Sequence, residues 1–432
     1  MGRIAEVAEK YWTGAISARE QHPFTPLLAL EEVAPGVAFV SSFANVTAIA
    51  GERGLTLVDT GSAQLAAQVH ASVRGWSEAP VHTAVYTHGH IDHVFGIERF
   101  DEEAAKEGRP PPRVIAHQAV LQRFERYRLT AGYNSCINSR QFQLPVAWPV
   151  KFREPDETYA SQLSLGLDGI DAELHHARGE TDDHTWVWLP SLRVVCTGDL
   201  FIWAVPNAGN PQKVQRYPRQ WADALRKMAA LGPEILLPGH GLPIFGEARV
   251  HAALSETAEL LELLHDRALA MMNAGATLEE IVRAVEMPAH LAARPYLQPI
   301  YDEPEFIVRN VWRLYGGWWD GDPAHLKPAP ASDLASELAK LAGGASQLAA
   351  RAKVLAANGD LRLAGHLAEF AVRAEPTNED AHRTRIEVNT QRAATETTLM
   401  AKGVFNGAVR DSQAVVDPEA LTAAPRRNVG IG

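Results

Sequence analysis

The sequence predicts an α/β fold followed by an all-helical part. From Val37 to about Leu200, short runs rich in β-branched residues alternate with turn residues, a pattern that is typical of strands. After Gly246 these runs stop, and apolar residues recur at three- to four-residue spacing instead, which indicates helices. Strands and helices mixed this densely in the N-terminal part favour a layered arrangement around one core.

The N-terminal part contains several short apolar runs that we expect to form strands. We expect a helix over residues 63–75, and a long polar and aromatic insertion interrupts the strands over residues 123–159. The expected strands are Val37–Val40, Thr47–Ala50, Leu55–Val58, Val81–Tyr86, Val114–Ala116, Glu173–His176, Thr185–Leu189, Val194–Thr197 and Ile235–Leu236.

Helices are expected throughout the C-terminal part. A long helix is predicted over 250–274, and Thr277 and Glu280 have the spacing of a capping box for the next helix. Two further helices, over 345–357 and 361–374, form one helical-hairpin unit. We therefore expect a catalytic domain at 1–249, an all-α domain at 250–410 and a C-terminal tail at 411–432.

Composition excludes some classes of function. The chain carries 41 Lys and Arg against 52 Asp and Glu, a net charge of -11 that would repel nucleic acid and anionic membranes. The two cysteines, Cys136 and Cys196, are too few for a disulfide framework and fit a reducing compartment. We find neither a signal segment nor an apolar run long enough to cross a bilayer, so we expect a cytoplasmic protein without membrane insertion.

Metal-binding side chains are concentrated in residues 87–93, Thr-His-Gly-His-Ile-Asp-His, directly after an expected strand. Imidazole nitrogens and carboxylate oxygens are ligands that zinc prefers. His88 and His90 would point the same way in an extended segment, whereas the adjacent Asp92 and His93 must diverge. The spacing therefore predicts two metal ions rather than one.

Three more motifs place an acid or a histidine at the end of an expected strand. Asp199 follows Gly198, His240 follows Gly239, and Asp59 opens the sequence Asp-Thr-Gly. In this order, the motifs resemble those of the metallo-β-lactamase superfamily, and the resemblance covers about residues 33–246. It implies an αββα sandwich for this part of the chain.

The resemblance also implies roles for these residues. His88 and His90 would bind one metal, Asp199 would bridge both metals, and Asp59 would orient the histidine loop by hydrogen bonds. Asp92, His93 and His240 would bind the second metal. The implied set of metal ligands is His88, His90, Asp92, His93, Glu180, Asp199 and His240.

The third ligand of the first metal departs from the common pattern of the superfamily. Most members have a histidine after a Pro-Gly pair, whereas this chain has Arg-Gly-Glu at 178–180. Aligning the motifs on Gly179 puts Glu180 at the ligand position, and a carboxylate binds zinc at a similar distance. His176 and His184 are the alternatives for this role.

A glutamate at this position, followed by a helical part, resembles the alkylsulfatase branch of the superfamily. The pattern Tyr-x-Gly-Trp-x-Asp-Gly-x-Pro-x-His at 315–325 is similar to part of its dimerisation domain. The resemblance implies a homodimer or a higher homo-oligomer. Trp318 and Trp319 would either contact a neighbouring subunit or pack between helices of their own chain.

The activity implied by this resemblance is that of a binuclear zinc hydrolase, although iron or manganese would also fit. A metal-bridged hydroxide would attack a sulfate ester or a related small ester, with Asp92 and Asp199 as catalytic residues. Arg216 would bind the anionic substrate, or it is a surface residue at the start of a helix. The insertion at 127–148, together with Trp203 and Asn207, would line the cleft.

Other activities remain open on the same scaffold. A lactonase, a β-lactamase-like amidase or a phosphodiesterase would use the same metal ligands. An iron-bound redox protein or a dioxygenase is a further alternative, because histidines and carboxylates also suit iron.

Overall fold

A computed structural model describes residues 2–167 and 169–418. These residues form two compact units. We call residues 2–131 and 148–317 the sheet unit, and residues 132–147 and 318–418 the helical unit. Within the described residues, no helix is both long and apolar enough to cross a lipid bilayer.

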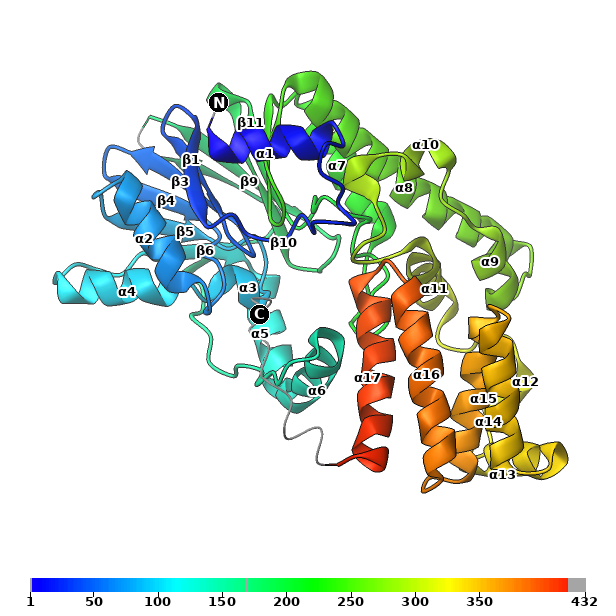
Figure 1. The fold of residues 1–432 in the computed structure, drawn as a ribbon. Coiled ribbons are helices and arrows are strands. Elements are labelled where there is room, and N and C mark those ends of the chain that lie inside the picture. The colour runs from blue at the N-terminus through cyan, green and yellow to red at the C-terminus, as the bar shows by residue number, and fades with distance from the viewer. Residues whose placement is uncertain (1, 168, 419–432) are drawn as a thin grey trace. The chain divides into compact units, whose positions relative to one another are not determined.

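The first sheet of the sheet unit has seven strands in the order of the chain (Figure 1). Its first four strands are antiparallel, and β4 to β7 are parallel. The strands are β1 (Ala29–Ala34), β2 (Val37–Ser41), β3 (Val46–Gly51), β4 (Gly54–Val58), β5 (Val81–Val85), β6 (Arg113–His117) and β7 (Glu157–Tyr159).

The second sheet has six strands in the order β13-β12-β11-β10-β9-β8. Strands β11 and β12 are parallel, and the other neighbouring pairs are antiparallel. The strands are β8 (Gln162–Gly166), β9 (Asp171–Ala177), β10 (His184–Leu189), β11 (Val194–Gly198), β12 (Ile235–Pro238) and β13 (Ile244–Phe245).

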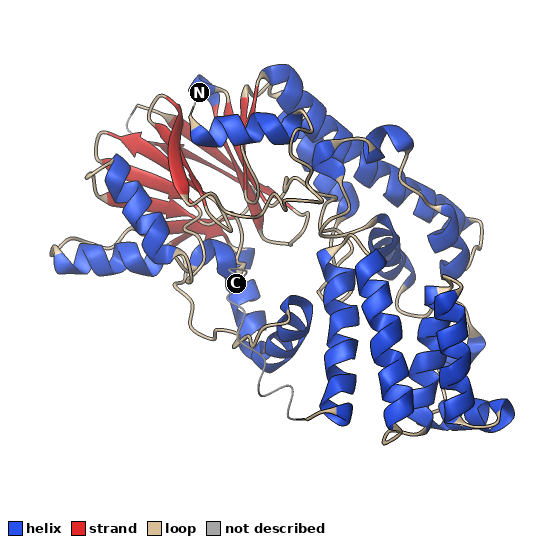
Figure 2. Ribbon diagram, in the orientation of Figure 1, coloured by secondary structure: helices blue, strands red, loops and turns tan. Residues whose placement is uncertain are grey.

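Helices surround both sheets of the sheet unit, and Figure 2 separates these elements by colour. Figure 1 shows α2 and α4 beside the first sheet and α7 and α8 beside the second. The helices are α1 (Arg3–Trp12), α2 (Ala66–Trp76), α3 (Ile91–Val94), α4 (Ile97–Lys106), α5 (Ala119–Leu129), α7 (Pro218–Ala230), α8 (Glu247–Asn273), α9 (Leu278–Ala284), α10 (Ala289–Ala292) and α11 (Pro304–Gly316).

The core follows from the alternation of side chains along the strands. In β2, Phe39 faces the second sheet, while Ala38 and Val40 face the outer helices. One cluster joins the two sheets with α7 and α8, and a second cluster packs α2, α4 and α5 against the other face of the first sheet. This is the expected αββα sandwich, which is confirmed.

The helical unit contains α6 from residue 132 and six further helices. The expected hairpin is observed as α14 and α15, which pack against each other and against α16. Asp360, Asn378 and Thr398 cap the starts of α15, α16 and α17. The helices are α6 (Ala131–Phe142), α12 (Pro323–Leu326), α13 (Ala331–Ala342), α14 (Ala345–Ala357), α15 (Leu361–Ala374), α16 (Glu379–Thr395) and α17 (Leu399–Val416).

Some elements differ from the sequence-based expectation. The insertion at 123–159 contains most of α5 and all of α6, which the polar pattern did not indicate. Helix α17 runs to Val416, into the segment 411–432 that was expected to be a tail, because buried Ser412 bonds His382 at 3.0 Å. The rest of that segment from residue 419 lies outside the described residues, and the expected domain boundary at 249 stays a prediction.

Candidate metal centre

The histidine loop begins where β5 ends and runs into the short helix α3. Asp59 follows the neighbouring parallel strand β4, and Asp199 and His240 follow the parallel pair β11 and β12. The ends of parallel strands lie at one edge of a sheet, so segments far apart in sequence meet there. Glu180 joins them from the turn between β9 and β10.

Two groups of candidate ligands result. One group contains His88, His90, Glu180 and Asp199, and the other contains Asp92, His93 and His240. In each group, one ligand atom from every residue lies within 4.8 Å of the others. All seven residues predicted from the sequence lie in these two groups, and their role as metal ligands stays a prediction.

In the first group, Nε2 of His88 lies 2.8 Å from Nδ1 of His90. The Oε2 atom of Glu180 is 3.7 Å from the same His90 nitrogen and 4.0 Å from His88 Nε2. His184 stacks on His88 and His176 stacks on His117, but neither belongs to the group. The geometry therefore favours Glu180 over both histidines as the third donor.

Asp199 connects the two groups. Its Oδ2 atom lies 3.7 Å from His88 Nε2 and 3.5 Å from His240 Nε2, and its Oδ1 atom lies 3.3 Å from His93 Nε2. Asp92 lies 3.4 Å from His240 Nε2 and 3.7 Å from His93 Nε2. Asp199 is therefore close enough to both groups to contribute a carboxylate oxygen to each, and its role as a bridging ligand stays a prediction.

Several atoms that face this space lack hydrogen-bond partners among the described residues. They are Nε2 of His93, Oε2 of Glu180 and Oδ1 of Asp199, all buried; His93 Nε2 and Asp199 Oδ1 lie 3.3 Å apart, but not in hydrogen-bond geometry. Buried polar atoms are normally paired, and an unpaired one costs about 1–3 kcal/mol. Metal ions would satisfy these atoms, so the donor set fits divalent metals.

Glycines allow the strand ends to approach so closely. A Cβ atom on Gly239 would lie 2.2 Å from Asp199 Oδ1, and one on Gly198 would lie 2.6 Å from His184 Nε2. Gly198 also has a φ of +50°. The glycine before each of these two ligands is therefore required by space.

Asp59 holds the histidine loop from outside the ligand groups, as expected. Its Oδ1 atom accepts a hydrogen bond from the backbone N–H of Thr87 at 2.7 Å, and its Oδ2 atom lies 2.7 Å from Nδ1 of His93. Asp59 adopts a φ of 57°, a strained conformation for a residue with a side chain. Contacts of this kind orient the ligand imidazole.

The charges in the centre also fit metal binding. Burial lowers the pKa of His88 and of His90 well below the usual value, which leaves neutral imidazoles. Burial alone would also lower the pKa of His240, but Asp199 and Asp92 outweigh it and raise this pKa to about 10. Burial raises the pKa of Glu180 to about 8, with Arg216 opposing the rise and Asp199 adding to it. Without metal, Glu180 and His240 thus hold protons near neutral pH, and metal ions would displace these protons.

Arg216 lies buried beside Glu180, not at the surface. It is 2% exposed, its Nη1 atom donates to the backbone oxygen of Glu180, and Nη1 lies 3.5 Å from Oε1 of Glu180. Its buried Nε atom has no hydrogen-bond partner among the described residues. A buried cation with an unused donor is suited to bind an anion.

The other residues that were expected to line the cleft lie in different places. Asn207 is buried, and its Nδ2 atom donates to Oε1 of Glu180. Trp203 packs in the core instead of lining a cleft, because its Nε1 atom bonds the backbone of Leu242 at 2.6 Å and it is 1% exposed. Residues 132–147 of the insertion belong to the helical unit, and a role beside the metals stays a prediction.

An aromatic wall, formed by Phe24, Phe43 and Tyr301, lies beside the second ligand group and was not predicted from the sequence. Phe24 stacks on His240 with ring centroids 4.8 Å apart, and Phe43 contacts the same imidazole edge-on at 5.0 Å. Tyr301 contacts Phe24 in turn. These residues come from segments that no local motif connects to the histidine loop.

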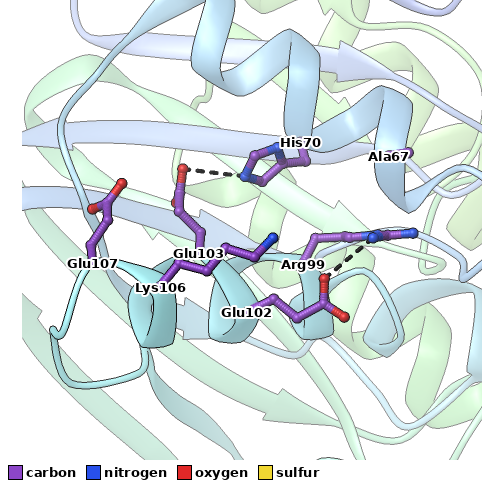
Figure 3. A pocket seen from close by; sticks show the side chains of 7 residues that line it. All are labelled: Ala67, His70, Arg99, Glu102, Glu103, Lys106 and Glu107. Atoms are coloured by element: carbon purple, nitrogen blue, oxygen red, sulfur yellow. Dashed lines mark hydrogen bonds and ion pairs between the residues drawn. The ribbon is translucent and has the colours of Figure 1, made fainter.

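A separate hollow lies between α2 and α4 (Figure 3). His70 and Glu103 meet there at 3.3 Å, and the other lining side chains are mostly charged. The hollow contains none of the candidate ligands.

Two family models match the chain. Residues 41–240 match the metallo-beta-lactamase superfamily, and residues 277–413 match the alkyl sulfatase dimerisation model. The first match includes every candidate ligand of the centre. The second lies within the helical C-terminal part, including the pattern at 315–325.

Curated relatives point to the same branch. The chain is 29% identical over 350 residues to a linear primary-alkylsulfatase from Pseudomonas sp., covering 76% of this chain and 66% of the relative. It is 27% identical to an (R)-specific secondary-alkylsulfatase from Pseudomonas sp., covering 85% of this chain and 59% of that one. The chain thus spans about three-fifths to two-thirds of the length of these relatives.

A solved structure shares the architecture. The stereoselective inverting sec-alkylsulfatase from Pseudomonas sp. superposes with a TM-score of 0.80 at 26% identity, covering 90% of this chain and 66% of that one. Residues 41–240 therefore form a metallo-β-lactamase domain and residues 277–413 match an alkylsulfatase-type dimerisation domain, and in this combination the chain is similar to alkylsulfatases.

Proposed function

We propose that this chain is a binuclear, zinc-dependent hydrolase of sulfate esters. The observation that carries the proposal is one arrangement: two groups of candidate ligands share Asp199, and the buried cation Arg216 lies directly beside them. The relatives named as alkylsulfatases support the choice of a sulfate ester. The products would be an alcohol and inorganic sulfate.

Each part of the centre would have a separate task. One ion would be held by His88, His90, Glu180 and Asp199. The other ion would be held by Asp92, His93 and His240, together with Asp199. Two divalent ions lower the pKa of water from about 15.7 towards about 7 and neutralise negative charge on an ester. The unused Nε donor of Arg216 would bind a sulfate oxygen and orient the ester.

The aromatic wall would receive the organic part of the substrate. Phe43 and Tyr301 are only partly buried; Phe43 contacts His240 directly, and Tyr301 contacts Phe24, which stacks on His240. Apolar side chains around a few polar groups are typical of small-molecule sites. We propose that a short apolar alcohol portion packs there while Arg216 holds the sulfate.

We also propose that the chain forms a homodimer through its helical unit. Trp318 is 72% exposed, and Leu334 and Leu341 on α13 are exposed as well. A second copy that packs on this part of the helical unit would remove these apolar side chains from water. The match of residues 277–413 to a dimerisation model supports a second copy as the occupant.

The test is a hydrolysis screen across alkyl sulfates, lactones, β-lactams and phosphodiesters, before and after chelation. We expect sulfate release from alkyl sulfates that disappears with chelator and returns with added zinc. Preferential turnover of a lactone, an amide or a phosphodiester would replace the substrate assignment but keep the metal centre. Metal analysis and visible absorption of protein purified without added metal would reveal an iron centre instead.

A further inference from the structure

The segment between the first two candidate ligands is held by a residue that the metal motifs do not include. Gly89 separates His88 from His90, and its backbone N–H donates to Oδ2 of Asp183 at 2.9 Å. Asp183 is 0% exposed. The histidine loop is therefore fixed at its centre by a buried carboxylate from the turn before β10.

The same carboxylate is fixed on its other side by an arginine. Oδ1 of Asp183 accepts a hydrogen bond from Nε of Arg123 at 2.8 Å, and Arg123 is 2% exposed. The Nη2 atom of Arg123 donates to Asp182 as well. A buried carboxylate is costly unless it is paired. In Asp183, one oxygen accepts from the backbone of Gly89 and the other accepts from Arg123.

Gly89 is also packed closely against Arg123, Phe124 and Asp183. A Cβ atom on Gly89 would lie 2.9 Å from Cδ of Arg123, 3.1 Å from Cε1 of Phe124 and 3.2 Å from Oδ2 of Asp183. Both Arg123 and Phe124 are on α5. Side chains of α5 thus pack against the backbone between His88 and His90, and only a glycine at position 89 leaves room for them.

The loop therefore has two anchors, on different sides. Asp59 holds its beginning through Thr87 and holds His93, whereas Asp183 holds its centre between His88 and His90. The second anchor acts on the first ligand group alone. Hydrogen bonds that fix the backbone of a ligand loop reduce the ordering that metal binding must otherwise supply.

We propose that Asp183, paired with Arg123, is a positioning residue that sets the metal affinity of the first ligand group. The proposal rests on the ligation proposed above for His88 and His90. Asp183 does not belong to either ligand group, so it acts through the backbone of Gly89. Its loss would weaken one site and spare the other.

The experiment is Asp183→Asn in the full chain, with two-site metal titration by zinc competition against a chelator and by the visible spectrum of Co²⁺-loaded protein. We expect the affinity of one site to fall about 10- to 100-fold, the range for lost outer contacts of a metal site, with the other site unchanged. Arg123→Lys, which keeps the charge but loses the fork of donors, should weaken the same site to a smaller extent.

Asp156→Asn is the matched control. Oδ2 of Asp156 accepts a backbone N–H, from Val114 at 2.8 Å, and an arginine, Arg153 at 2.8 Å, but it lies away from the ligand groups. This variant should bind both metals normally. If Asp183→Asn does not fold, the Arg123→Lys titration decides alone.

The proposal would be overturned if Asp183→Asn bound metal with wild-type affinity at both sites. If only Arg123→Lys folds, wild-type affinity at both sites in that variant would overturn it. Equal weakening of both sites would overturn it too, since that indicates general destabilisation. The titration does not depend on turnover. A wild-type chain that binds two metals without hydrolysing sulfate esters would contradict the proposed function and leave this inference intact.

Discussion

Arg216→Gln should weaken the binding of sulfate esters without removing the metals. Arg216 is buried beside Glu180 and keeps its Nε donor free of partners among the described residues, so a sulfate oxygen would receive a hydrogen bond from a charged group. Such a bond contributes about 1.5–3 kcal/mol. At about 1.4 kcal/mol for each tenfold change, KM for an alkyl sulfate should rise about 10- to 150-fold.

The assay measures initial rates of sulfate release over a range of substrate concentrations, together with inhibition by inorganic sulfate and metal content. Inhibition by inorganic sulfate should weaken by a similar factor as KM rises, because the sulfate group would contact Arg216 with or without the alcohol portion attached. Arg219→Gln is the control, since Arg219 is 46% exposed and pairs with Asp223 on its own helix. An unchanged KM and unchanged sulfate inhibition in Arg216→Gln would show that Arg216 does not bind the sulfate group.

Three further predictions concern pH, the glycine before His240 and the oligomer. Burial beside His117 lowers the pKa of His176 from 6.5 to about 4; the unfolded chain therefore binds a proton that the native chain does not. The contribution of His176 to the free energy of unfolding should therefore fall by about 2 kcal/mol as the pH drops from 6.5 to 4, after allowance for partial exposure. Urea unfolding of His176→Gln should show a correspondingly smaller loss of stability over this pH range. An equal loss in both proteins would contradict a lowered pKa of His176. Gly239→Ala should lose bound metal on elemental analysis, because its Cβ atom would lie 2.2 Å from Oδ1 of Asp199, and full metal content would show that the strand ends can move apart. Trp318→Ser should shift the mass in light scattering from a dimer towards a monomer, with Lys353→Ser as the control, and a wild-type mass would place the interface elsewhere.

Much of the metal centre could be predicted because its signals are local. The histidine loop, Asp199 and His240 each follow a short apolar run, and Gly198 and Gly239 mark the tight approaches before two of these ligands. The parallel pairing of β4 with β5 and of β11 with β12 then brings these strand ends together. The capping box at Thr277 was likewise visible as a spacing of residue types and is present at the start of α9.

The parts that could not be predicted depend on contacts between distant segments. Asp183 stands next to a motif and could be noticed as one of two adjacent acids, but nothing in the sequence connects it to Arg123, sixty positions away. Phe24 reaches His240 from the N-terminal segment before β1. Helix α6 was missed because its apolar residues do not gather on one face, and amide side chains are buried on it.

If this centre is a sulfate ester hydrolase, its activity should require both the bound metal and the ligand set. The most direct test measures sulfate release from an alkyl sulfate by zinc-loaded protein and by zinc-loaded Asp92→Ala, with metal content determined for both. We expect turnover by the wild-type protein with two zinc ions per chain, and loss of turnover in Asp92→Ala. Sulfate release that is unchanged in Asp92→Ala, or that persists in metal-free protein, would contradict this expectation.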